Sequence, residues 1–333
     1  METITLAHGN GGQLTQELIE DIIYRYCGND ILLTSDDAAY LPKVEGQLVT
    51  STDSFVVDPL FFPGGDIGKL AVCGTVNDLA VNGAQPLYLT VGLILEEGLK
   101  LDKLKRIMQS IAKTAQGAGI KVVAGDTKVV PQGKGGEIYI NTTGLGVVGP
   151  GINLQDVEIE IGDKIIISGS IGDHGATILA QREGFEVSSA LKSDCTLLHN
   201  LTAQILSSSK GIKFLTDPTR GGLATALHEI AQQNQVAINL EAAKLPIKKE
   251  VQGLGEILGI APLYLASEGR VLGVVAAEEA ETVVKEMQTN PRGKGAVVIG
   301  EVTGNKSQVC LKTNLGGTRI LRPLHKQLLP RIC

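Results

Sequence analysis

The chain has 333 residues, the usual length of two domains. Its 30 Lys and Arg residues against 36 Asp and Glu residues give a net charge of −6, so it lacks the basic excess that would hold a nucleic-acid backbone or an anionic membrane surface. Aromatic residues make up 3% of the chain and tryptophan is absent, which argues against stacking platforms for bases or sugars.

Five cysteines are spread widely along the chain, and no two of them form a C-x-x-C pair. This spacing excludes a zinc ribbon and a thioredoxin-type motif. The number is odd, and the N-terminal residues lack the basic and apolar regions of a signal peptide, so we expect a reduced, cytoplasmic protein. No apolar run approaches the length that spans a membrane. One cysteine, Cys333, is the last residue of the sequence.

The first half of the chain alternates between segments typical of strands and segments typical of helices. Strands are predicted over residues 31–34, 48–51, 87–95, 120–124 and 137–148. Leu104, Ile107 and Ile111 recur at steps of three and four residues, which predicts a helix over 101–115 that glycines terminate. A further helix is predicted over 65–80.

The same alternation resumes after Gly149, Pro150 and Gly151, which predict a domain boundary. Strands are predicted over 164–168, 237–240, 271–276 and 296–302, and helices over 176–182, 223–233 and 278–288. The fold class is therefore α/β or α+β. We expect a first domain over 1–150, a second over 151–320, and an extended, flexible tail over 321–333, because Pro323 and Pro330 disfavour helix.

Aspartates recur at strand ends and turns of the first half. They are Asp36, Asp53, Asp58, Asp78 and Asp126. Each alone is ordinary solvated turn chemistry. Open α/β sheets, however, collect ligands where strands end, and converging carboxylates need a hard cation to neutralise their repulsion. Mg²⁺ bound to a polyphosphate is the common solution, so the set predicts such a site.

The predicted helix over 65–80 carries Lys69, Cys73 and Asn77 on one face, since these residues are four apart. A cation near a helix start opposes the macrodipole, which suggests a compensating phosphate contact for Lys69. An exposed lysine on an ordinary polar stripe is the alternative, and the helix alone favours it.

Three glycine-rich turns are further candidates for ligand contact. His8 to Gly12 could cover a nucleotide, but it follows no strand and is neither a Rossmann fingerprint nor a P-loop. Residues 168–175 contain Gly-Asp-His-Gly directly after a predicted strand. Residues 217–222, Asp-Pro-Thr-Arg-Gly-Gly, precede a predicted helix, where backbone N–H groups and the Arg220 guanidinium would favour an anion. A capping turn without a ligand is the alternative there.

These motifs occur in one order along the whole chain: HGNGG, SDDAAY, TDSFVVDPLFFPGGDIGKLAVCGTVNDLA, AGDTKVV, GDHG, DPTRGG and a terminal PRIC. Together they resemble the HypE family of hydrogenase maturation factors, within the PurM-like superfamily of ATP-using enzymes typified by aminoimidazole ribonucleotide synthetase. The resemblance implies a two-domain PurM-like fold. It also implies that the N-terminal domain contains a mixed sheet through which two chains form a homodimer, and that the C-terminal domain is α/β.

The resemblance further implies an ATP-dependent carbamoyl dehydratase. A carbamoyl group that a HypF-type carbamoyltransferase delivers to Cys333 would be dehydrated to a thiocyanate, which then passes through a HypC–HypD complex to the iron of [NiFe]-hydrogenase. Matching positions make Lys134, in the Gly-Lys-Gly stretch, and Glu268, in the Ala-Ser-Glu-Gly stretch, the catalytic candidates beside Cys333.

The residue types suit this chemistry. Phosphorylation by ATP would make the carbamoyl oxygen a leaving group, Glu268 would take the N–H protons, and Lys134 would stabilise developing negative charge. Magnesium is expected on Asp36, Asp53 and Asp78. Nucleotide contacts are expected from Asp58, Lys69, Asn77, Asp126, Asp217 and Arg220. The twelve steps from Leu321 to Cys333 reach up to about 40 Å, so the thiol could visit both an internal site and a partner.

Two other functions fit parts of the sequence. An ATP-dependent ligase or small-molecule kinase with the same fold would act on a free substrate and would not need Cys333. A non-enzymatic scaffold would bind nucleotide and assemble maturation proteins without using Glu268 or Lys134.

Overall fold

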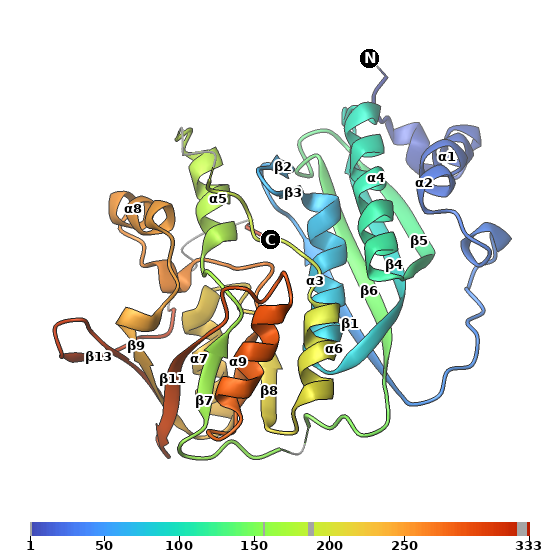
Figure 1. The fold of residues 1–333 in the computed structure, drawn as a ribbon. Helices are drawn as coiled ribbons and strands as arrows, with labels where there is room; N and C mark the ends of the chain where they lie inside the picture. Colours follow the sequence, from blue (N-terminus) through green and yellow to red (C-terminus); the bar gives the residue numbers. More distant parts are fainter. Residues whose placement is uncertain (1, 156, 186–189, 325–331) are drawn as a thin grey trace.

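The structure is a computed structural model that describes residues 2–155, 157–185, 190–324 and 332–333. Each half of the chain builds its own sheet, and Figure 1 shows the two halves side by side with the C-terminal residue between α5 and α3. Among the described residues, no helix is both long enough and apolar enough to cross a bilayer.

The first half forms a four-stranded sheet in the order β1-β6-β4-β5, in which β4 and β5 are parallel and the other neighbours are antiparallel. Its described elements are a 3₁₀ turn (Leu6–Gly9), α1 (Gln13–Leu18), a π-helical segment (Ile19–Tyr24), α2 (Arg25–Cys27), a 3₁₀ turn (Leu32–Thr34), β1 (Gln47–Phe55), β2 (Phe61–Phe62), β3 (Gly65–Asp66), α3 (Ile67–Val81), β4 (Ala84–Glu96), α4 (Leu101–Ala118), β5 (Lys121–Val130) and β6 (Ile138–Val148).

The second half forms a seven-stranded sheet in the order β13-β12-β9-β11-β7-β10-β8, in which only β9 and β12 run parallel among the described strands. Its described elements are β7 (Lys164–Ile167), α5 (Asp173–Arg182), α6 (His199–Ser208), β8 (Ile212–Thr216), α7 (Gly222–Gln233), β9 (Ala237–Glu241), a 3₁₀ turn (Ala242–Lys244), α8 (Lys249–Leu258), a 3₁₀ turn (Pro262–Tyr264), β10 (Leu272–Val275), α9 (Ala280–Thr289), β11 (Val297–Gly304), β12 (Gln308–Lys312) and β13 (Thr318–Ile320).

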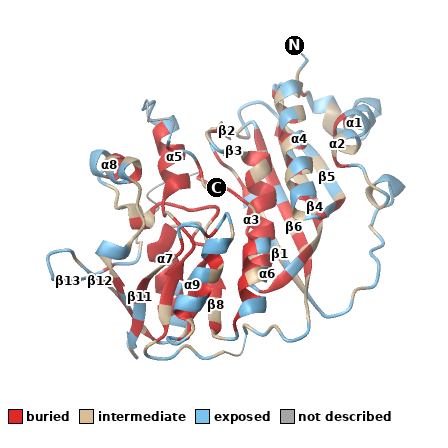
Figure 2. Ribbon diagram, viewed as in Figure 1, coloured by how far each residue is buried: buried red, intermediate tan, exposed pale blue. Residues whose placement is uncertain are grey.

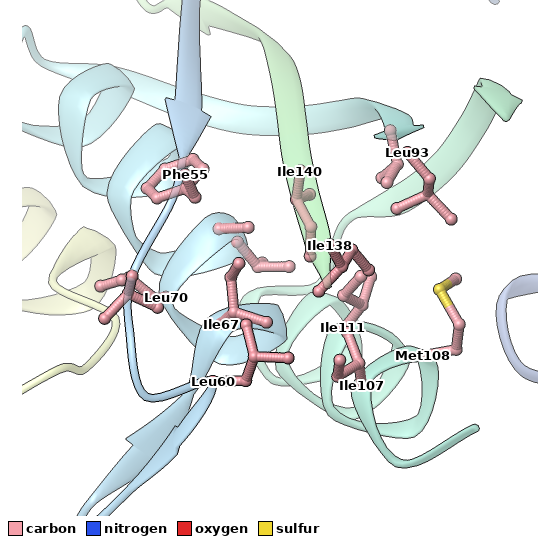
Figure 3. Packing of buried hydrophobic residues seen from close by; sticks show 14 of the residues in the cluster. Phe55, Leu60, Ile67, Leu70, Leu93, Ile107, Met108, Ile111, Ile138 and Ile140 are labelled. Carbon is pink, nitrogen blue, oxygen red and sulfur yellow. The ribbon is translucent and has the colours of Figure 1, made fainter. Parts of the chain in front are cut away.

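Helix α4 is amphipathic and covers one face of the first sheet. Its buried residues, among them Leu104, Ile107 and Ile111, recur at steps of three and four. Figure 3 shows Ile107 and Ile111 close to Ile138 of β6, within one buried cluster. Burial of each such side chain contributes about 1.5–3 kcal/mol, so this face holds the helix on the sheet.

Helix α3 lies where the two halves meet. Its N-terminus is capped by Asp66, whose carboxylate accepts hydrogen bonds from the N–H groups of Gly68 and Lys69. It is buried along nearly its whole length (Figure 2), because it contacts β1, β6 and α4 in its own half and α6 in the other. Its apolar residues therefore occupy all faces, which is why the sequence shows no single apolar stripe.

Asn77 of α3 joins the two halves directly. Its side-chain amide donates to the carbonyl oxygen of Thr196 over 3.0 Å and accepts from the N–H of Leu198 over 2.8 Å. The Asn77 side chain is fully buried. We call these two bonds the Asn77 bridge; they satisfy buried backbone groups of the second half through a residue of the first.

Most predicted elements are present, including the helices over 65–80 and 101–115, which correspond to α3 and α4. The predicted strand over 31–34 is wrong, since Leu32–Thr34 forms a 3₁₀ turn. The side-chain oxygen of Asn29 accepts from the N–H groups of Ile31 and Leu32. These local hydrogen bonds favour a turn, although the apolar residues that follow Asn29 are typical of a strand. Sequence patterns did not reveal α6, β8, α8, β12 or β13.

Asn77→Ala is expected to lower the free energy of unfolding by about 2–4 kcal/mol, because the Thr196 carbonyl and the Leu198 N–H would both stay buried without partners. Urea denaturation of the purified chain measures this. Asn82→Ala is the matched control, since Asn82 is exposed at the end of α3 and bonds only within its own helix. Equal losses in the two variants would show that the Asn77 bridge does not hold the halves together.

Candidate active site

A cavity of about 630 Å³ lies between the two halves. Its described lining comes from β1 and α3 of the first half, and from the turn 217–222, the segment 264–268 and the chain end 332–333 of the second. Half of the twelve site residues expected from sequence meet there: Asp53, Asp78, Asp217, Arg220, Glu268 and Cys333. The lining thus combines carboxylates, a guanidinium and the terminal thiol.

Three of these carboxylates crowd one another. The side chain of Asp53 lies against that of Asp78, and Ser51 Oγ donates to Asp78 Oδ2 over 2.7 Å. Burial first, then the negative charge of Asp217, raises the pKa of Asp78 to about 8. Burial, followed by the charge of Asp53, raises the pKa of Asp217 to about 7. The cluster therefore resists full ionisation at neutral pH.

This donor set fits a divalent cation. Asp217 Oδ2 is buried and has no hydrogen-bond partner among the described residues, and carboxylate oxygens are the ligands that Mg²⁺ prefers. No group of three or more His, Cys, Asp or Glu side chains is already arranged to hold a metal ion in the described part of the chain. Asp53, Asp78 and Asp217 could therefore hold Mg²⁺ only together with ligands supplied by a bound molecule.

Glu268 and Cys333 are in contact in the cavity. The Cys333 thiol lies against the Glu268 carboxylate, and Glu268 is 2% exposed. Burial, with the charges of Asp217 and Asp194 next, raises the pKa of Glu268 well above its usual range. Burial and the Glu268 carboxylate raise the pKa of Cys333 as well. In this position Cys333 is a protonated thiol, and Glu268 is a stronger base than a solvated glutamate.

Two close backbone approaches shape this part of the cavity. Gly222, at the end of the turn 217–222, has φ +63°, and a Cβ there would lie 2.5 Å from the Leu265 carbonyl oxygen. A Cβ on Gly269 would lie 1.9 Å from the Asp194 carbonyl oxygen. Only glycine fits either position, so these residues fix the turn and the Glu268 segment against their neighbours.

Four expected site residues lie on exposed segments and do not line the cavity. Asp36 follows the 3₁₀ turn Leu32–Thr34, and Asp58 is exposed beyond β1. Asp126 is on β5, the opposite edge strand from β1, and pairs with Lys128 over 2.8 Å. Lys134 is exposed in the turn between β5 and β6.

The predicted shared face of α3 exists, but it turns away from this cavity. Lys69 and Cys73 line a second cavity of about 730 Å³ between the halves. Lys69 Nζ donates to the Gly64 carbonyl oxygen over 2.8 Å. Both polar atoms of the Asn77 amide are used in the Asn77 bridge, so this geometry offers no support for a nucleotide contact at Asn77.

Sequence patterns missed two residues beside the site. The side chain of Asp194 is 1% exposed and accepts from the Glu268 N–H over 3.1 Å, but no local pattern marks it. His174 is buried and contacts the carbonyl oxygen of Ile332. It belongs to the Gly-Asp-His-Gly stretch, a motif that predicts ligand contact without giving the histidine a role.

The ligand-free protein is expected to lose stability as the pH rises from about 4 to about 8. Asp78 and Asp217 keep their protons in the folded state while the unfolded chain releases them, so the unfolded state binds fewer protons in this window. The loss reaches about 1.4 kcal/mol per pH unit for each retained proton. Thermal unfolding between pH 4 and 8 measures it. Asp217→Asn should flatten the profile, and an unchanged slope in that variant would contradict the assignment.

Comparisons with known proteins cover the whole chain. The family model "AIR synthase related protein, N-terminal domain" matches residues 35–148, and the corresponding C-terminal domain model matches residues 160–311. Carbamoyl dehydratase HypE from Azotobacter vinelandii is 45% identical over 332 residues, which cover 99% of this chain and 97% of that protein. The sequence-based expectation of a PurM-like fold is confirmed by the two family models.

Solved structures agree with these matches. A crystal structure of the hydrogenase maturation protein HypE in complex with ATP is 43% identical, with a TM-score of 0.95, covering 99% of this chain and 100% of that one. A crystal structure of a HypE–HypF complex is 43% identical, with a TM-score of 0.81, covering 92% and 99%. Full-length identity at this level and the cavity that joins Glu268 to the terminal cysteine lead to one conclusion: the chain belongs to the HypE family of carbamoyl dehydratases.

Proposed function

We propose that this chain uses ATP to dehydrate an S-carbamoyl group on Cys333 to a thiocyanate, which supplies the cyanide ligand for [NiFe]-hydrogenase maturation. The observation that carries the proposal is the contact between the Cys333 thiol and the Glu268 carboxylate inside a cavity lined by aspartates. A group carried on Cys333 would lie against a strong base and beside the residues suited to hold a nucleotide.

The reaction has to remove the carbamoyl oxygen and two protons from nitrogen. Attack of that oxygen on the γ-phosphorus of ATP forms an O–P bond, releases ADP and makes the oxygen part of a phosphate leaving group. Glu268 accepts a proton from nitrogen as the C–O bond breaks. The second nitrogen proton passes to solvent, and the products are the thiocyanate, ADP and inorganic phosphate. The unpartnered Oε1 of Glu268 is available for this transfer.

The cavity suits a neutral S-carbamoyl group better than a thiolate. Burial and neighbouring carboxylates raise the pKa of Cys333, so the inserted thiol is a poor nucleophile. We therefore propose that carbamoylation occurs with the tail exposed to a HypF-type carbamoyltransferase, and dehydration with the tail inserted. The existence of a HypE–HypF complex among the relatives supports the first partner. A HypC–HypD complex is proposed as the acceptor of the cyano group.

Mg²⁺ and ATP would bind where Asp53, Asp78 and Asp217 crowd together. The metal would neutralise the cluster and the phosphates, and Arg220 would contact phosphate oxygens from the turn 217–222. Lys134 remains the proposed group that stabilises charge on the leaving oxygen. The expected contributions of five further residues also remain proposals, although none of them lines the cavity: Asp36, Asp58, Asp126, Lys69 and Asn77.

We propose that the chain consists of two domains, 1–150 and 151–320, followed by an extended tail over 321–333. Residues 325–331 of the tail lie outside the described residues.

We also propose a homodimer through the face of the first sheet that α3 and α4 do not cover. Two large apolar side chains on its strands support this, because Leu48 is 64% exposed and Ile94 is 43% exposed. All five cysteines are free, which agrees with the proposed cytoplasmic location.

Intact mass spectrometry of the chain pre-carbamoylated on Cys333 tests the function. ATP and Mg²⁺ should remove the mass of one water from the wild type, while Glu268→Gln should retain the carbamoyl mass with a rate loss of at least about a hundredfold. The same sample under native conditions should give the mass of two chains.

Cys333→Ala separates the alternatives. A ligase or kinase acting on a free substrate would keep its full ATP turnover in this variant, and a scaffold would show no mass change in any variant. Wild-type protein that keeps the carbamoyl mass in the presence of ATP would refute the proposed dehydration.

A further inference from the structure

His174 of α5 contacts the end of the chain. It is fully buried in the first turn of α5, and its Nε2 lies 2.8 Å from the carbonyl oxygen of Ile332. Its Nδ1 lies 2.8 Å from Ser193 Oγ. Ile332 precedes Cys333, so this bond acts one residue away from the thiol that contacts Glu268.

The direction of each bond follows from the partners. A carbonyl oxygen only accepts, so the proton of the imidazole is on Nε2, and Nδ1 accepts from the Ser193 hydroxyl. Ser193 Oγ in turn accepts from the Cys195 N–H over 3.1 Å. Burial lowers the pKa of His174 to about 4, which keeps the ring neutral and this tautomer in place.

Both halves of the protein hold the imidazole. The ring of Phe62 packs edge-on against it, with 5.4 Å between ring centroids and 82° between planes. The N–H of Ser193 donates to the carbonyl oxygen of Pro63 over 2.9 Å. His174 therefore presents its N–H at a position fixed relative to the cavity, and not on a freely rotating side chain.

The tail is bonded at both of its described ends. At its start, His228 Nε2 donates to the Leu321 carbonyl oxygen over 2.7 Å, and the Tyr264 hydroxyl donates to the Arg322 carbonyl oxygen over 2.6 Å. At its end, Ile332 is 7% exposed within the core cluster that contains Phe62. In the described part of the chain, this apolar contact, the bond from His174 and the contact of Cys333 with Glu268 hold the end.

We propose that His174 is a positioning residue that anchors the chain end in the cavity, so that the group carried on Cys333 reaches Glu268. The proposal rests on the function proposed above. Without the Nε2–H donor, the Ile332 carbonyl would be buried without a partner, which shifts the tail toward its exposed position by about tenfold. Among the described contacts, His174 reaches the chain end through Ile332 and the Glu268 segment only indirectly, through Ser193 and Asp194. A variant that keeps the Ser193 contact therefore isolates the effect that passes through the tail.

The test compares two variants that divide the functions of the imidazole. The amide of His174→Asn lies near the Nδ1 position and keeps the contact with Ser193, but it is too short to reach Ile332. The amide of His174→Gln reaches the Nε2 position and can donate to Ile332. The readout is the rate at which a soluble thiol reagent modifies Cys333 in the presence of ATP and Mg²⁺, after subtraction of the rate in Cys333→Ala.

We expect His174→Asn to raise this rate about tenfold and His174→Gln to restore it to near the wild-type value. His228→Asn is the matched control, because it removes the same kind of bond at the start of the tail and should leave the Cys333 rate unchanged. Equal rates in wild type and His174→Asn, or no rescue by His174→Gln, would overturn the proposal.

A double-mutant cycle separates positioning from a general structural role. In a chain shortened by Ile332 and Cys333, His174 has no carbonyl to bind, so His174→Asn should lower the melting temperature less than in the full chain. Equal losses in both backgrounds would make His174 merely structural and refute the proposal. Modification of Cys333 by the thiol reagent does not require dehydration. The modification rates therefore test the anchoring role of His174 even if the proposed function is wrong.

Discussion

The Asn77 bridge is the interaction on which the site depends. One buried amide of α3 satisfies two backbone groups of the segment that also carries Ser193 and Asp194. This segment contacts Glu268 through Asp194 and His174 through Ser193. This contact across α3, together with the bond from the Ser193 N–H to the Pro63 carbonyl oxygen, sets the relative position of the two halves and so the cavity between β1 and the Glu268 segment.

Electrostatics give the cavity its chemical character. Carboxylates that burial and mutual repulsion keep partly protonated destabilise the ligand-free protein, and bound cations would remove that cost. The same environment raises the pKa values of Cys333 and Glu268, so the thiol keeps its proton and the ionised form of Glu268 is a stronger base than a solvated carboxylate. A neutral group on sulfur is therefore favoured inside the cavity, which fits the proposal that loading takes place with the tail outside and dehydration with the tail inserted.

Local sequence patterns predicted what local interactions determine. The periodicity of α4 and the glycines of the turn 217–222 correspond to observed elements because their causes lie within a few residues. Family motifs identified Glu268 and Cys333, which the fold brings together. Asp126 and Asp53 each come after apolar residues in the sequence, but they lie within β5 and β1, the opposite edge strands of one sheet. His174 and Ile332 are 158 positions apart, and no short-range pattern connects them.

The central claim is that Glu268 acts on the group carried by Cys333 of the same chain. Mixed dimers of differently tagged Glu268→Gln and Cys333→Ala chains test it, with infrared detection of the C≡N stretch after carbamoylation and addition of ATP. Neither chain then holds both groups, so no thiocyanate should form, while dimers of wild type with the double variant should keep half the wild-type yield. Thiocyanate formation by the two single variants in one dimer would contradict the account.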